Sequence, residues 1–156
     1  MKKYLICLVI LLLSACASET APIESGKDLR FYVATDIHLL SKDLMKNDEL
    51  MAQVFEYGDS RFVHYSNEIM STLSDTVKNN EVDVLILSGD LTHDGEKASH
   101  LAMAAQLKEI EKNGTRVFVV PGNHDLENPF AKDYAEGGWV TAETITKDDF
   151  EDIYKN

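Results

Sequence analysis

Residues 82–95, VDVLILSGDLTHDG, join an apolar run to a Gly-Asp pair and a polar loop. The run is rich in β-branched residues and nearly continuous, which is typical of a strand in a parallel sheet covered on both faces. Two similar apolar runs lie at residues 29–34 and 117–120, and each is also followed by polar residues. The sequence therefore predicts three parallel strands, covered on both faces, with a polar loop after each.

Two segments with helical periodicity separate these strands. The first has apolar residues three and four positions apart, and its expected buried stripe is Phe62, Tyr65, Ile69, Leu73 and Val77. The second runs from about residue 97 to 112 and ends at a left-handed Asn113-Gly114 stop. Its expected inward side chains are Leu101, Ala104, Ala105, Leu107 and Ile110. The order of elements indicates an α/β fold with right-handed crossovers.

Two further segments complete the predicted domain. Residues 40–58 form an acidic connection that is longer than such loops usually are, and we expect an insertion near the site. Residues 146–149, TKDD, are typical of a capping box that opens a short final helix. Because three buried strands alone do not finish a sheet, we expect residues 29–156 to be the incomplete N-terminal part of a larger domain.

The first 28 residues are typical of an export signal and a tether. Lys2 and Lys3 precede an apolar run too short to span a bilayer. The residues Leu13-Ser14-Ala15-Cys16 then resemble the lipobox of bacterial lipoproteins. We expect a signal peptide at residues 1–15, lipidation of Cys16 and a flexible tether at residues 16–28. An ordinary signal cut near Ala17 is the alternative.

Charge and cysteine content exclude several kinds of protein. The chain has 15 basic and 27 acidic residues, so it is a poor candidate for nonspecific nucleic-acid binding. Cys7 lies in the predicted signal and Cys16 is the predicted lipidation site, so no cysteine-metal site or disulfide framework is available. We therefore expect no specific nucleic-acid partner, and a two-metal nuclease is disfavoured.

Metal-binding residue types follow all three predicted strands, in DIH at 36–38, GDLTHD at 89–94 and GNHD at 122–125. Loops at the carboxyl ends of parallel strands converge on one edge of a sheet. Oxygen and imidazole donors without sulfur suit Mn, Fe or Zn. Two such ions about 3.5–4 Å apart can neutralise a phosphate ester and activate water. The pattern therefore predicts a two-metal hydrolase of phosphate esters.

These three motifs resemble the first three motifs of the calcineurin-like metallophosphoesterases. The resemblance implies the N-terminal βαβαβ half of a metallophosphoesterase-type α/β sandwich, which has four layers in the complete family domain. The longer context, including residues 124–129, is similar to exported bacterial members related to cyclic-nucleotide phosphodiesterases. A phosphodiester or phosphomonoester, and among these a cyclic nucleotide, is the implied substrate.

The resemblance also implies roles for individual residues. Asp36 and His38 are the implied ligands of one metal, Asp90 bridges both metals, and Asn123 binds the second. His124 then stabilises the transition state or protonates the leaving oxygen, while a metal-bound hydroxide attacks. Asp125 is expected to orient His124 by a hydrogen bond. The metals are expected to be two divalent or trivalent ions, Mn, Fe or Zn.

This sequence departs from the family pattern in two respects. The family's later motifs, a lone His and a Gly-His-x-His, have no counterpart, because His124 is the last histidine. We therefore expect weak metal binding and slow turnover by this polypeptide. His93 also stands where some members have an aspartate that orients the catalytic histidine, so that support is in question. Two roles remain open for His93 and Asp94: each could support the site from behind its ligands or form hydrogen bonds within its own loop.

Simpler interpretations remain open for several residues. Gly89-Asp90 and Asn123 could be turn residues. His64 and His100 are expected to be solvated or packing residues, and the Met residues to fill the core. Gly137-Gly138-Trp139 is expected to be a turn with a packed indole. The competing function is a non-catalytic surface lipoprotein that keeps the fold but lacks a complete dimetal site. Either protein would be exported and lipid-anchored on the extracytoplasmic face of a membrane.

Overall fold

A computed structural model describes residue 26 and residues 28–57, 62–135 and 138–155 of the chain. Its strands are β1 (Phe31–Ala34), β2 (Val84–Ser88), β3 (Arg116–Val120), β4 (Lys132–Asp133) and β5 (Val140–Thr141). Its helices are η1 (Lys42–Leu44), α1 (Asp48–Tyr57), η2 (Val63–Tyr65), α2 (Ser66–Asn79), α3 (Lys97–Glu111) and α4 (Lys147–Tyr154). The α/β class predicted from the sequence is confirmed.

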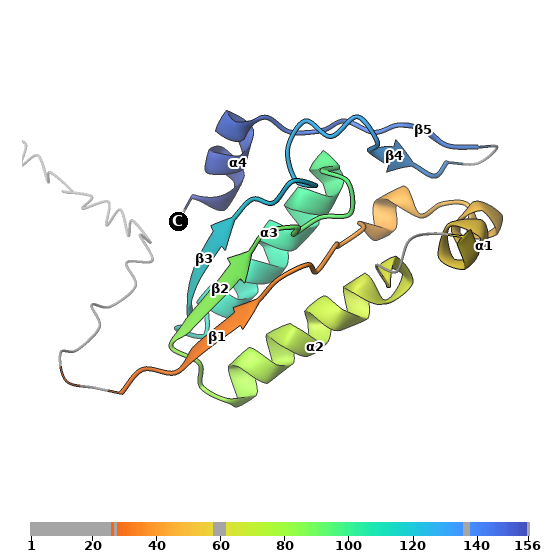
Figure 1. Cartoon of the computed structure of the whole chain (residues 1–156). Helices are drawn as coiled ribbons and strands as arrows, with labels where there is room; N and C mark the ends of the chain where they lie inside the picture. The colour runs from red at the N-terminus through yellow and green to blue at the C-terminus, as the bar shows by residue number, and fades with distance from the viewer. Residues whose placement is uncertain (1–25, 27, 58–61, 136–137, 156) are drawn as a thin grey trace, which may run out of the picture.

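A three-stranded parallel sheet in the order β1-β2-β3 forms the centre of the domain (Figure 1). Val33 pairs with Ile86, and Ile86 pairs with Phe118, so the three strands are in register across the sheet. Helices α2 and α3 are the two crossover connections. The three predicted parallel strands are therefore all present.

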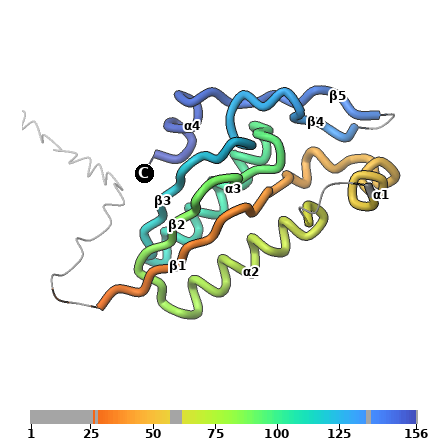
Figure 2. Tube along the Cα trace, viewed as in Figure 1, coloured from red at the N-terminus to blue at the C-terminus, as the bar shows by residue number. Residues whose placement is uncertain are grey.

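Both crossover helices pack on the same face of the sheet. Side chains of α2 and α3, such as Met70 and Leu107, join Leu85 and Leu87 of β2 in the main core. In Figure 1, α3 lies behind the strands, and the tube in Figure 2 follows both crossovers. The opposite face exposes large apolar residues, namely Phe31, Val33, Phe118 and Val120. The expectation that the strands are covered on both faces is therefore wrong for the described residues, because both crossovers run in the same direction across the sheet.

The buried face of α2 differs from the predicted stripe. Phe62, Tyr65 and Ile69 are exposed, but Val77 is buried as predicted and Leu73 packs against the core. The other inward positions of the helix are Ser66, Met70 and Ser74. The Ser66 hydroxyl accepts a hydrogen bond from the backbone N–H of Leu40. Small serines thus let α2 approach the neighbouring chain closely, and apolar spacing alone does not reveal this. The second helix matches better, since Ala104, Leu107 and Ile110 are buried, although Leu101 and Ala105 are exposed.

The segment after β1 is largely helical rather than a loop. It contains η1 and α1, which contribute Leu44 and Met51 to a second apolar cluster. Tyr134 of the β4–β5 hairpin completes this cluster. The hairpin itself was not predicted, and Trp139 within it is 57% exposed, so the expected packed indole is wrong. Lys132 instead places its ammonium 4.7 Å from the centre of the Trp139 ring.

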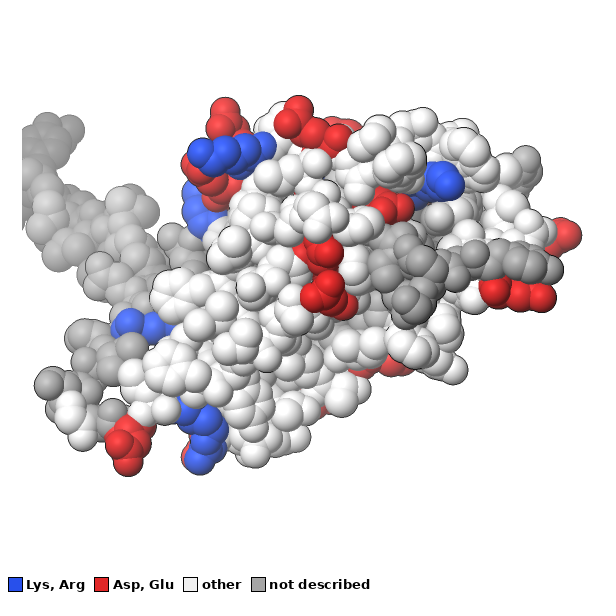
Figure 3. Space-filling model, in the orientation of Figure 1, with Lys and Arg blue, Asp and Glu red and all other residues white. Residues whose placement is uncertain are grey.

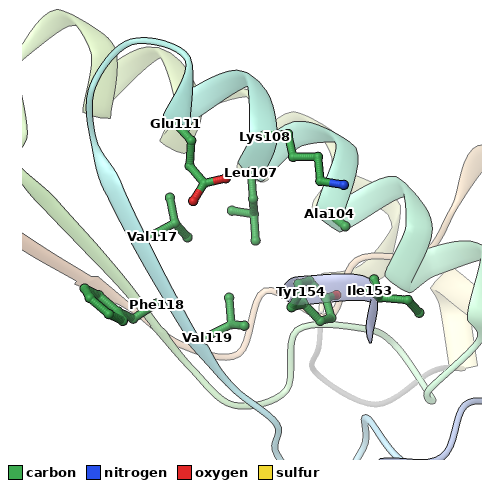
Figure 4. Close-up of a pocket in the computed structure, with 9 residues that line it drawn as sticks. All are labelled: Ala104, Leu107, Lys108, Glu111, Val117, Phe118, Val119, Ile153 and Tyr154. Carbon is green, nitrogen blue, oxygen red and sulfur yellow. The ribbon is translucent and has the colours of Figure 1, made fainter. Parts of the chain in front are cut away.

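The final helix begins with the capping box predicted from the sequence. The Thr146 hydroxyl accepts from the N–H of Asp149, and the Asp149 carboxylate accepts from the N–H of Thr146. Figure 4 shows a pocket between α3, β3 and the end of α4, with Leu107, Val117 and Tyr154 among its lining residues. This pocket shares no residue with the three metal-type loops.

The predicted signal peptide, Cys16 and almost all of the tether lie outside the described residues. Within the described ranges, no helix combines the length and the apolar character that a bilayer span requires.

Candidate metal centre

The loops after β1 and β2 run side by side beyond the ends of their strands. The N–H groups of Asp36, His38 and Leu39 donate to the carbonyls of Gly89, Asp90 and Leu91, at 3.2, 3.0 and 2.9 Å. The parallel hydrogen-bond ladder thus continues into the loops. It holds the first and second metal-type motifs against each other.

Three of the predicted ligands form a compact donor cluster. One ligand atom from each of Asp36, His38 and Asp90 lies within 4.8 Å of the other two. The Nε2 atom of His38 is 3.8 Å from a carboxylate oxygen of Asp36 and 3.8 Å from one of Asp90. Two carboxylates and an imidazole are a donor set that fits a divalent ion such as Mn, Fe or Zn. The side chain of Asp36 is largely open to solvent, so the cluster is accessible to an ion.

The backbone at all three residues is left-handed. Asp36, His38 and Asp90 have φ values of 55°, 47° and 46°. This region is uncommon for residues other than glycine, and such strain costs on the order of 1–3 kcal/mol per residue. Strain of this kind is concentrated at functional sites, where the surrounding structure maintains it. Here it accompanies the convergence of three donor side chains.

Gly122 brings the third motif against Asp90. A Cβ atom at Gly122 would lie 2.2 Å from Oδ1 of Asp90 and 2.3 Å from its backbone nitrogen. No side chain fits there without moving the loop. Asp90 Oδ1 also accepts a hydrogen bond from the N–H of His124 at 3.0 Å. Asn123 is exposed between two residues that both contact Asp90, which places it at the same edge of the sheet.

His124 faces the donor cluster and is held by Asp94. Its ring lies edge-on to that of His38, with centroids 5.1 Å apart. Nδ1 of His124 is 2.9 Å from Oδ1 of Asp94. Since a carboxylate only accepts, Nδ1 carries the proton in this contact. His93 lies beside the same carboxylate, with Nε2 3.6 Å from Oδ2 of Asp94.

The Asp125 carboxylate holds two loops together and does not form the expected bond to the His124 ring. This buried carboxylate accepts from the N–H groups of Leu91, Thr92 and Gly122 and from the Thr92 hydroxyl, at 2.8 to 3.1 Å. It therefore ties the second loop to the third. Asp94, and not Asp125, is the carboxylate bonded to the His124 ring, which corrects the expected role of Asp125.

A buried chain of hydrogen bonds extends from Asp125 to α4. Nε2 of His100 is 2.8 Å from the backbone oxygen of Asp125, and Nδ1 is 2.9 Å from the hydroxyl of Tyr154. The carbonyl only accepts, so Nε2 donates and the tyrosine hydroxyl donates to Nδ1. Burial lowers the pKa of His100, and burial raises that of Tyr154. His100 is thus a packing residue, one of the two roles expected for it, and it also supports the third loop.

Asn128 is a site residue that the sequence did not reveal. Its amide nitrogen donates to the backbone oxygen of His124 at 3.2 Å and lies 3.5 Å from Oδ1 of Asp94. Its side-chain oxygen accepts from the N–H of Phe130 at 3.0 Å. The only signal in the sequence is an asparagine before Pro129, which is equally typical of a turn.

The fold and the donor set are those expected of a metal-dependent phosphoesterase domain. The chain belongs to the calcineurin-like phosphoesterase family, whose sequence model matches residues 29–155. Members of this family bind divalent metal ions, which agrees with the cluster at Asp36, His38 and Asp90.

Two curated relatives are similar over shorter stretches. A probable cyclic nucleotide phosphodiesterase of Vesicomyosocius okutanii is 34% identical over 55 residues, which are 35% of this chain and 22% of the relative. A probable cyclic nucleotide phosphodiesterase of Coxiella burnetii is 33% identical over 82 residues, which are 53% of this chain and 32% of the relative. The chain thus matches a third or less of the length of each relative.

Proposed function

We propose that this protein hydrolyses phosphodiesters, with cyclic nucleotides among its substrates, at the sheet edge formed by residues 36–38, 89–94 and 122–128. The observation that carries the proposal is the convergence of Asp36, His38 and Asp90, with His124 edge-on to the cluster. The names of the two relatives support the narrower choice of cyclic nucleotides.

The donor types at this edge fit a metal pair of the Mn, Fe or Zn type. Asp36 and His38 would hold one ion, Asp90 would contact both, and Asn123 would contribute its amide oxygen to the second. When bound, such ions neutralise the charge of the phosphate and supply an activated water. The left-handed backbone at Asp36, His38 and Asp90 favours an arrangement preformed for the ions.

His124 acts on the phosphoryl group. Its Nδ1 is held by Asp94, and its ring lies edge-on to that of His38 in the donor cluster. A protonated Nε2 can donate to a phosphoryl oxygen as charge develops, or to the leaving oxygen as the ester bond breaks. Asp94 stabilises the imidazolium form through the same contact. Asp125 and Asn128 keep the loops that carry these residues together.

The proposed place of action is outside the cytoplasm, on a membrane surface. This rests on the basic start, the short apolar run and the Leu13-Ser14-Ala15-Cys16 motif. Acylation of Cys16 would provide the anchor. A radiolabelled palmitate incorporation assay with Cys16→Ser as the comparison tests it, and equal labelling of both proteins would refute it.

Metal binding and hydrolysis in the Asp90→Asn variant test the proposed site. Asn keeps the size of the side chain and can still accept from the His124 N–H, so the loop is preserved. We expect Mn²⁺ affinity measured by calorimetry to fall at least tenfold and manganese-dependent hydrolysis of bis-p-nitrophenyl phosphate to be lost. Asp75→Asn, on the exposed surface of α2, is the matched control and should leave both unchanged.

The same experiment separates the proposal from its competitor. A non-catalytic surface lipoprotein would show no turnover above that of Asp90→Asn, whether or not it binds Mn²⁺ through Asp90. Equal metal affinity in wild type and Asp90→Asn would reject the proposed site and would leave the non-catalytic lipoprotein, which needs only the fold.

A further inference from the structure

We infer that Phe130 is a stacking surface for the base of a nucleoside phosphate, and that it makes this site selective for nucleotides over simple phosphate esters. The inference rests on the proposed function and adds a residue that recognises the base of the substrate. Its basis is an exposed ring on a residue whose backbone is hydrogen-bonded, through the side chain of Asn128, to the backbone of His124.

The side chain of Phe130 is largely open to solvent although it is fully apolar. The residue is 68% exposed, the highest value among the large hydrophobic residues of the described chain that are solvent-exposed. Its neighbour Ala131 is 1% exposed and fills the space under the hairpin. Phe130 lies in a turn just before β4, where Ala131 is buried while the Phe130 side chain is exposed to solvent.

The backbone of Phe130 is fixed to the proposed catalytic loop. Its N–H donates to Oδ1 of Asn128, and the amide nitrogen of the same Asn128 donates to the backbone oxygen of His124. One side chain, that of Asn128, therefore links the backbone of Phe130 to the backbone of His124. The backbone at Phe130 is thus fixed before a ligand binds, so little backbone freedom is lost on binding.

The surroundings of Phe130 suit an anionic aromatic ligand. Lys132 lies two residues further along the chain, at the start of β4, and its ammonium lies over the ring of Trp139. In a chain with a net charge of −12, this ammonium is a local positive group beside the exposed ring of Trp139 and two residues from Phe130. Aromatic side chains stack with any base, and a nearby cation favours the attached phosphate. A nucleoside phosphate has both parts, with its phosphate at the donor cluster and its base over Phe130.

Binding of AMP and of inorganic phosphate, both measured by calorimetry with Mn²⁺ present, tests the inference. Phosphate reports the metal-dependent site, and AMP adds the nucleoside. We expect wild type to bind AMP more tightly than phosphate. In Phe130→Leu, the dissociation constant for AMP should rise about 5- to 150-fold, the range that corresponds to loss of one stacked base, while phosphate affinity stays the same. Phe130→Tyr should restore AMP binding.

Two further measurements make the result specific. Phe62→Leu removes an equally exposed ring elsewhere and should not change AMP binding. Trp139 is the only tryptophan of the chain, so its fluorescence should change with AMP and not with phosphate. Equal affinity for both ligands in wild type, or equal loss of both in Phe130→Leu, would overturn the inference and leave the phosphoesterase site intact. If neither ligand bound, the proposed function would fail as well.

Discussion

Asp94 contacts both His124 and the amide of Asn128, so it joins the ring that handles phosphate to the segment that carries Phe130. A group that orients a reacting imidazole also selects which ring nitrogen carries the proton. Removing its charge leaves the ring in place but stabilises its protonated form less. Asp94 is therefore a positioning residue for His124.

We predict that Asp94→Asn lowers kcat for bis-p-nitrophenyl phosphate by about 10- to 100-fold, the range found when an outer hydrogen-bond partner of a site residue is lost. KM should change little, since Asp94 does not reach the substrate. The ¹⁵N shifts of the His124 ring should change in the same variant. Unchanged kcat together with unchanged ring shifts would show that Asp94 has no such role.

The convergence of the three loops could be predicted from the sequence, but the contacts within it could not. Parallel strands deliver their following loops to one edge, so Asp36, His38 and Asp90 were expected to meet, and the structure brings them together. The choice between Asp94 and Asp125 depends on how the backbone turns after Asp90, whose φ is positive. Asp94 and Asp125 each directly follow a histidine, so residue spacing does not show which of the two carboxylates bonds to the His124 ring.

At the scale of elements, the N-terminus of α3 holds a buried carboxylic acid. Glu96 immediately precedes the helix and is fully buried, and burial raises its pKa from 4.5 to about 7. Neither carboxylate oxygen has a hydrogen bond of standard geometry. The folded protein therefore retains a proton between about pH 4.5 and pH 7 that the unfolded chain releases. The contribution of Glu96 to stability is largest below pH 4.5 and is lost as the pH rises through 7.

We predict that Glu96→Gln raises the free energy of unfolding at pH 8 by on the order of 3 kcal/mol, which is the cost of ionising a group shifted this far. At pH 4 the two proteins should be nearly equal, because Glu96 is then protonated in both states. Urea denaturation at the two pH values measures the difference. The exposed Glu68→Gln on α2 should show no such dependence, and a gain for Glu96→Gln that is equal at both pH values would contradict the prediction.

The elements themselves could be predicted to different degrees, for physical reasons. The strands and the capping box at Thr146 have strong local signals, and both are present. The inward face of α2 was misassigned because Ser66 is buried by a hydrogen bond rather than by apolar contact. The β4–β5 hairpin has only two residues in each strand, too few to show alternation. Such elements depend on tertiary contacts, here through Tyr134 of the hairpin, which joins Leu44 and Met51 in the second apolar cluster.

At the scale of the whole molecule, one face of the sheet is not covered by any helix of the described residues and exposes apolar side chains. Figure 3 shows the side turned toward the viewer in Figure 1, where white, uncharged atoms predominate and most of the basic atoms lie toward the edges. Phe118 is 55% exposed on this face and Val33 is 67% exposed. Contiguous apolar surface of this kind promotes association in solution.

We predict that Phe118→Gln reduces self-association of the 156-residue chain, measured by sedimentation velocity at increasing protein concentration. Stability should change by no more than about 1 kcal/mol, because the side chain is already half exposed. Leu85→Ala, on the covered face of the neighbouring strand, should instead cost about 2–5 kcal/mol without reducing association. A Phe118→Gln protein that associates as strongly as wild type would show that this face is not responsible.

The four hydrogen bonds received by the Asp125 carboxylate also bear on how the molecule opens. Its partners belong to two loops that are 30 residues apart in the chain, at Leu91, Thr92 and Gly122. If either loop detached, the buried Asp125 carboxylate would lose hydrogen bonds that it receives in the folded protein. Partial unfolding of one loop is therefore coupled to that of the other. Amide hydrogens at Leu91 and Gly122 should consequently exchange with solvent in a single cooperative event, and metal ligands from different strands would be released together.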